Sequence, residues 1–146
     1  MAGDFIVIFS DRRHFGSHPA CFDDETIFQV ERVDAGVIFV VAKETISFHT
    51  PGIDLHQPAV LIYESFDVTS PRNIIKINGV EIPGGIPVSS RRGEWKNNLS
   101  VLEPGSLLED KVNELFVEAY GESDDSDSIL DNFILTSAIV LYKTMA

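Results

Sequence analysis

The sequence predicts an all-β fold, a sandwich or barrel of short antiparallel strands. Segments rich in β-branched and aromatic residues recur along the chain, with turn residues between them at the spacing of these two architectures. An Asn78-Gly79 pair joins two such segments, which is typical of a tight hairpin. No internal repeat, low-complexity tract or long linker divides the 146 residues, so we expect a single β-sandwich domain, residues 1–146.

Several candidate strands lie outside this central hairpin. They cover residues 5–9, 26–33, 36–41, 45–49, 59–66, 133–135 and 138–142. Residues 26–33 alternate between the two sides of a strand. Residues 36–41 are instead almost continuously apolar, and this pattern predicts a strand buried on both faces. Pro51 and Gly52 end the strand before them.

The clearest local signal is the hairpin itself, within residues 73–83. Asn and Gly tolerate the positive φ angles of a type I′ turn, so a two-residue loop is expected at Asn78-Gly79. This loop sets three cross-strand pairs: Ile77 with Val80, Lys76 with Glu81, and Ile75 with Ile82. The prolines and glycines of residues 83–87 then predict an irregular loop that continues to Trp95.

Residues 107–120 fit two patterns. Ser106-Leu107-Leu108-Glu109 has the form of a helix capping box, and the apolar residues that follow it fall on one helical face. Residues 113–120 also alternate, with Leu115 and Val117 on the same side, as in a half-buried strand. The residues alone leave both structures open.

The composition is that of an ordinary soluble globular protein, with 44% hydrophobic and 23% charged residues. A net charge of −12 repels a phosphate backbone, so neither nucleic acid nor an anionic membrane is an expected partner. The lone Cys21 can form no internal disulfide, and the first residues lack the basic start of a signal peptide. No segment reaches the roughly 20 apolar residues of a membrane span. A cytoplasmic location is the default expectation.

Landmarks between residues 59 and 143 occur in a recognisable order. They are Ala59-Val60-Leu61-Ile62-Tyr63, Ile77-Asn78-Gly79, Trp95, Leu102-Glu103-Pro104-Gly105, Val112-Asn113-Glu114-Leu115, and Asp131-Asn132-Phe133 before a final apolar strand. This order resembles the jelly-roll β-sandwich of galactose-binding-like domains, which occur in many carbohydrate-binding modules and in sugar-binding domains of glycosidases. The resemblance implies an antiparallel jelly roll with at most short helical turns. It favours one helical turn near Leu107, followed by a strand.

One loop has the composition of a carbohydrate site. Sugars stack their C–H faces on aromatic rings, and their hydroxyls require fixed planar donors and acceptors. The single tryptophan lies among such groups, and the candidate ligand-binding residues are Trp95, Arg91, Arg92, Asn97 and Asn98. The alternative is that Trp95 closes one end of the sandwich as a packing residue.

The acidic segment near the C-terminus is a candidate metal site. The family that the chain resembles often holds a structural calcium ion, and hard oxygen ligands of the required type are available here. They are Asp124, Asp125, Asp127 and Asp131. A solvated acidic loop is the alternative. His14, His18 and Cys21 could also bind a transition metal, although a polar loop is the simpler interpretation.

No catalytic constellation is recognisable, so we do not expect an enzyme; a small hydrolase or lyase is the less favoured alternative. The first functional hypothesis is a non-catalytic, lectin-like module that binds carbohydrate. The second is a structural or assembly protein that contacts another protein, or a second copy of itself, through a sandwich edge or its acidic surface. Fold alone does not choose between them, because sandwiches carry many unrelated functions.

Overall fold

The computed structural model describes residues 2–16, 37–91, 93–121 and 130–145, which form nine strands and no helix. The strands are β1 (Gly3–Phe15), β2 (Val37–Val41), β3 (Lys43–Phe48), β4 (Ala59–Phe66), β5 (Ile74–Ile77), β6 (Val80–Glu81), β7 (Trp95–Leu102), β8 (Asn113–Glu118) and β9 (Phe133–Lys143). Within the described ranges, no helix is long and apolar enough to cross a membrane.

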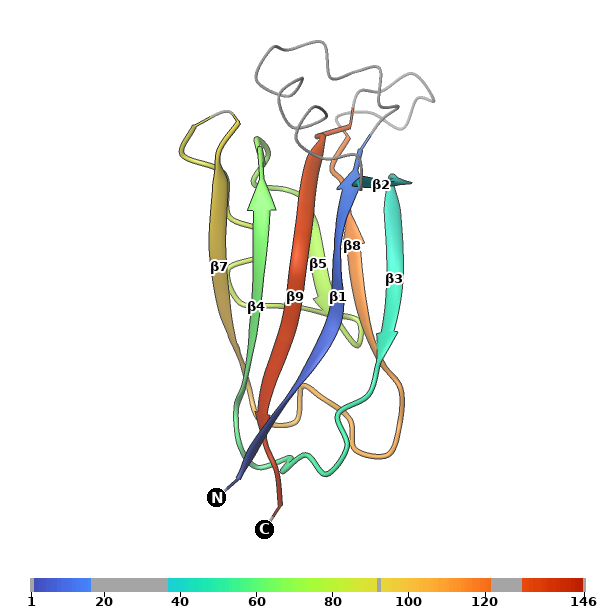
Figure 1. Cartoon of the computed structure of the whole chain (residues 1–146), viewed down its shortest axis with the longest axis vertical. Coiled ribbons are helices and arrows are strands. Elements are labelled where there is room, and N and C mark those ends of the chain that lie inside the picture. Colours follow the sequence, from blue (N-terminus) through green and yellow to red (C-terminus); the bar gives the residue numbers. More distant parts are fainter. Residues whose placement is uncertain (1, 17–36, 92, 122–129, 146) are drawn as a thin grey trace.

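The strands form two sheets that pack face to face (Figure 1). Sheet A has the order β2-β1-β9-β4-β7, and sheet B has the order β3-β8-β5-β6. With β2 set aside, the chain crosses between the sheets at every connection except the β5–β6 hairpin. The resulting strand orders, β1-β9-β4-β7 opposite β3-β8-β5-β6, are those of a jelly roll built from two Greek keys. Strand β2 is added to the outer edge of β1 by a parallel pairing, and the other strand pairs are antiparallel. The predicted all-β sandwich is confirmed.

The core lies between the two sheets and consists of the inward-facing residues of both. In β4 the alternate residues Leu61 and Tyr63 are buried, and in β8 the same holds for Leu115 and Val117. The rings of Phe15 and Phe133 stack at 5.5 Å near the end of the sandwich where β1 ends and β9 begins. The opposite end holds both termini (Figure 1), where the Thr144 amide donates to the Ala2 carbonyl at 3.0 Å.

The predicted hairpin is confirmed in its register. Lys76 lies opposite Glu81 and Ile77 opposite Val80, and the Ile82 amide donates to the Ile75 carbonyl at 3.2 Å. Asn78 and Gly79 have φ angles of 51° and 81°, as a type I′ turn requires.

The helical turn expected near Leu107 is wrong. The Ser106 hydroxyl donates to the Glu103 carbonyl at 2.7 Å, so it closes the preceding turn and does not cap a helix. The Leu108 amide donates a hydrogen bond to the Asn113 side-chain oxygen at 2.7 Å. The strand interpretation of the following residues is confirmed by β8.

Two other expectations need correction. The run 36–41 was expected to be buried on both faces, but β2 lies at the edge of sheet A and Ile38 is about half exposed. A continuous apolar run does not distinguish a central strand from an edge strand. The candidate strands 133–135 and 138–142 are one strand, β9, with Ser137 at φ 54° where its pairing register shifts. The candidate strand 26–33 lies outside the described residues.

Candidate functional site

The outer face of sheet A carries an ordered array of apolar side chains on four adjacent strands, β1, β9, β4 and β7. Strand pairing aligns them in two rows. The first row is Phe5, Leu141, Val60 and Val101, and the second is Val7, Ile139, Ile62 and Leu99. We call these eight residues the apolar face. None of the eight carries a polar or ionisable group.

Much of the apolar face is open to solvent. Leu99 is 67% exposed, Phe5 is 60% exposed and Val101 is 53% exposed. The outer face of sheet B is different, because it carries charged side chains of both signs in alternation with other residues. They are Lys43, Lys76, Glu81, Glu114 and Glu118. Sheet B therefore has an ordinary solvated outer face, whereas much of the outer face of sheet A is apolar.

Strand β7 has the reverse of the usual polarity. It buries the polar residues Asn98 and Ser100 and exposes the apolar residues Leu99 and Val101. The Asn98 amide donates to the Ser65 hydroxyl at 2.9 Å, and the Ser100 hydroxyl donates to the Pro83 carbonyl at 2.9 Å. A shift of one residue would exchange the two sets. These inward hydrogen bonds hold the register that places Leu99 and Val101 on the outer face.

A polar row lies beside the apolar face, toward the end of the sheet where β7 begins. Strand pairing aligns Arg12, Thr136, Glu64 and Asn97 in this row. The Thr136 hydroxyl is already used, since it donates to the Asp11 carbonyl at 2.8 Å. A hollow of about 430 Å³ adjoins the row and includes Glu64 and Asn97 in its lining. This is where an aromatic side chain and planar polar groups approach each other on the sheet.

Trp95 begins β7 just beyond the polar row and is 36% exposed. The Arg12 guanidinium lies 5.0 Å from the centre of the indole, and the Phe66 ring lies 5.1 Å from it at an angle of 50°. Arg12 and Phe66 therefore already contact the ring. Trp95 therefore packs on the sheet, as the packing interpretation expects, and keeps part of its surface in solvent.

The structure separates the predicted ligand-binding residues. Trp95 and Asn97 share the outer face of sheet A, whereas Asn98 points into the sandwich. Arg91 is exposed in the preceding loop, and Arg92 lies outside the described residues. Glu64 was not predicted, because only the pairing of β4 with β7 brings it beside Asn97. No local sequence pattern signals such a lateral contact.

Of the predicted calcium ligands, Asp131 alone is described; Asp124, Asp125 and Asp127 lie outside the described residues. The Asp131 carboxylate accepts from the Thr69 amide at 3.1 Å, the Thr69 hydroxyl at 2.5 Å, the Ser70 amide at 3.0 Å and the Asn73 side chain at 2.6 Å. It therefore holds the turn after β4. In the part of the chain that the structure describes, no group of three His, Cys, Asp or Glu residues is placed to hold a metal ion.

His14 is buried near the end of β1, with 3% of its surface exposed. Its Nε2 lies 3.0 Å from the Asn132 side-chain oxygen, whose amide nitrogen donates to the Leu130 carbonyl. Burial lowers the pKa of His14 from 6.5 to about 4, although the Asn132 hydrogen bond opposes this shift. The ring is therefore neutral at physiological pH and has a structural contact here. His18 and Cys21, its candidate co-ligands, lie outside the described residues.

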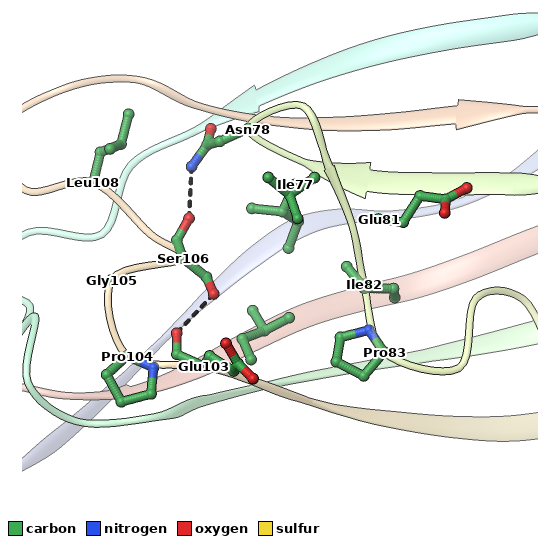
Figure 2. A pocket seen from close by; sticks show the side chains of 12 residues that line it. Ile77, Asn78, Glu81, Ile82, Pro83, Glu103, Pro104, Gly105, Ser106 and Leu108 are labelled. Carbon is green, nitrogen blue, oxygen red and sulfur yellow. Dashed lines mark hydrogen bonds between the residues drawn. The ribbon is translucent and has the colours of Figure 1, made fainter.

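A separate pocket of about 410 Å³ lies between the β5–β6 hairpin and residues 103–108 (Figure 2). Figure 2 shows the Asn78 side chain pointing toward the Ser106 carbonyl, to which its amide donates at 3.0 Å, while the Ser106 hydroxyl points toward Glu103. The same amide donates to Asn113 at 2.9 Å. These polar groups are occupied in joining the hairpin to the loop. Trp95 and Asn97 lie outside this pocket, so we assign it no ligand.

In comparisons of the chain with known proteins, no family model, no curated protein and no solved structure matched.

Proposed function

We propose that this chain is a non-catalytic interaction protein that binds a partner protein through the apolar face. The observation that carries the proposal is the array of exposed apolar side chains on β1, β9, β4 and β7. Contiguous exposed apolar patches beyond a few hundred Å² are rare on monomeric proteins and mark interaction sites. Isolated exposed apolar residues would carry no such meaning.

The contrast between the two sheets supports this proposal. Charged residues are interspersed on the outer face of sheet B, whereas the eight residues of the apolar face include none. The inverted polarity of β7 adds independent support. Asn98 and Ser100 are held inside by hydrogen bonds, so Leu99 and Val101 are on the outside by a specific arrangement and not by loose packing.

This contact surface differs from the one expected for an assembly protein from sequence. That expectation named a sandwich edge or the acidic surface, whereas the apolar face is the broad side of sheet A. A binding surface of this kind gains its free energy from removal of apolar area from water, at about 25 cal/mol per Å² before the costs of association.

The experiment is site-specific photo-crosslinking with a photoreactive residue at position 99. Val80 provides the matched control, because it is 71% exposed but lies on the β5–β6 hairpin, outside the apolar face. We expect discrete protein adducts from position 99 that are absent from position 80. Equal adduct patterns at both positions, or no adduct at position 99, would contradict the proposal.

A second candidate function is carbohydrate binding at the polar row. The specific observation is that Glu64 and Asn97 line a hollow of about 430 Å³ on the same face of sheet A as Trp95. An indole and a pair of planar polar groups are the elements that a sugar requires. The contacts of Trp95 with Arg12 and Phe66 reduce the ring area available for stacking, so this candidate stands second.

The carbohydrate candidate is tested by a glycan-array screen of the purified protein, with and without calcium. Selective binding that is lost in both Trp95→Ala and Asn97→Ala, but kept in Val80→Ala, is the expected result. If Trp95→Ala instead lowers the free energy of unfolding by roughly 3–5 kcal/mol, as a core truncation does, the residue acts in packing. Absence of glycan binding in the wild type would remove this candidate.

A further inference from the structure

We infer that the partner on the apolar face is the same face of a second copy of this chain, related by a two-fold axis. This inference rests on the proposed function and specifies its partner. The two outer faces of sheet A would stack about 10 Å apart, as sheets in a sandwich do. Such an interface is isologous, because each copy contributes the same residues.

The size of the apolar face fits a protein surface. Its five most exposed residues are Phe5, Val7, Leu99, Val101 and Leu141. With full residue surfaces on the order of 200 Å², their exposed parts amount to roughly 500 Å². A standard protein interface buries about 800 Å² per partner, with an apolar centre and a polar rim. The polar row and Lys143, at the two ends of the apolar face, supply groups for that rim.

The charge distribution favours a second copy over a charged partner. The chain has a net charge of −12, which would attract a basic protein, but the eight residues of the apolar face carry no charge. A partner selected by this face must itself be neutral and apolar at the contact. A second copy meets that requirement and is present at the same concentration.

The shape of the apolar face also allows it to pack against a copy of itself. Phe5 and Leu99 are the most exposed of the eight residues and lie at diagonally opposite corners of the array. Each borders a hollow, of about 420 Å³ at Phe5 and about 430 Å³ at Leu99. A face that has both projections and hollows can be complementary to a copy of itself.

Self-pairing of an apolar face predicts an unusual salt dependence. Two chains of charge −12 repel one another outside the contact, and salt screens this repulsion. Dimerisation should therefore strengthen as salt is raised. Binding of a basic partner to the acidic surface would weaken under the same change.

The experiment is sedimentation equilibrium of the full chain from micromolar to millimolar concentration, at low and high salt. We expect a reversible transition from 16.2 kDa to twice that mass, shifted toward dimer by salt. Leu99→Asp and Phe5→Asp, on opposite edges of the array, should each weaken dimerisation by roughly a hundredfold, because each would bury an unpaired carboxylate. Val80→Asp is the control and should change the dissociation constant by less than about twofold. Thermal melts verify that each variant is folded.

The outcomes separate this inference from the proposed function. A wild-type chain that stays monomeric at every concentration, or a dimer that Leu99→Asp and Phe5→Asp leave intact, overturns pairing through the apolar face. If the chain is monomeric and position 99 still crosslinks to a different protein while position 80 does not, the proposed function survives and the second copy is excluded. If position 99 yields no specific adduct, both fail.

Discussion

Asn98 on β7 donates its side-chain amide to the Ser65 hydroxyl on β4 at 2.9 Å, inside the sandwich, while its neighbour Asn97 faces solvent on the other side of the sheet. The two residues are chemically identical and differ only in the side of β7 on which they lie. A buried polar group whose partner is removed costs about 1–3 kcal/mol. The losses of unfolding free energy in variants at Asn97 and Asn98 therefore show which side of β7 is inside.

We expect Asn98→Ala to lower the free energy of unfolding by roughly 1–3 kcal/mol, because Ser65 loses its partner in the interior. Asn97→Ala should stay within about 0.5 kcal/mol of the wild type, since the side chain is exposed. Urea unfolding of both variants checks the difference. Equal losses, or a larger loss for Asn97→Ala, would mean that β7 has the opposite register.

Gly16→Ala should be strongly destabilising. Gly16 has a φ of 139°, and a methyl group there would lie 2.2 Å from the Asn132 side-chain oxygen and 2.9 Å from the Asn132 Cα. Backbone strain of this kind costs about 1–3 kcal/mol, and the displaced Asn132 would also lose its contact with His14.

Gly84→Ala is the matched control for this prediction. Gly84 also has a positive φ, 82°, but a methyl group there meets no atom within 4 Å. Its cost should be limited to the backbone term, about 1 kcal/mol. Unfolding free energies for the two variants test the steric argument, which fails if they are the same.

Asp131→Ala should cost about 3 kcal/mol, because it removes a carboxylate that accepts hydrogen bonds from Thr69, Ser70 and Asn73. We expect the same loss of thermal stability in calcium and in a chelator, since these contacts are within the protein. If calcium raises the melting temperature of the wild type and Asp131→Ala abolishes that increase, the carboxylate is instead part of a calcium site.

The fold class could be predicted because its signals are local. The Asn78-Gly79 turn carries its own backbone preference, and the alternation around Leu115 and Val117 specifies a strand with one buried side. The helical alternative at residues 106–109 failed because Ser106 bonds to Glu103, a choice that a capping pattern does not reveal.

The candidate site was only partly predictable. Composition identified Trp95 and Asn97, but an alternating pattern defines two sides of a strand without stating which one is inside. For β7, hydrophobicity favours Leu99 inside, whereas hydrogen bonds of Asn98 and Ser100 to distant residues decide the opposite. The apolar face exists only once four strands are paired, so no single segment displays it.

The lowered pKa of the buried His14 predicts that the protein loses stability on acidification. Its pKa is 6.5 in the unfolded chain and about 4 in the folded protein, where burial disfavours the imidazolium. The unfolded chain therefore binds the proton first as the pH falls. The contribution of His14 to the free energy of unfolding is complete above about pH 6.5 and is lost progressively as the pH falls toward 4. The loss amounts to about 3 kcal/mol, at 1.36 kcal/mol per pKa unit.

The matched variant for this pH dependence is His14→Gln, which is neutral at every pH and can still donate to the Asn132 oxygen. Carboxylates also titrate near pH 4, so the quantity to measure is the difference in unfolding free energy between wild type and variant. We expect this difference to change in favour of His14→Gln as the pH falls from 6.5 to 4, because the variant has no proton to bind. A difference independent of pH across this interval would mean that His14 titrates alike in both states, and its ring would then be accessible to water.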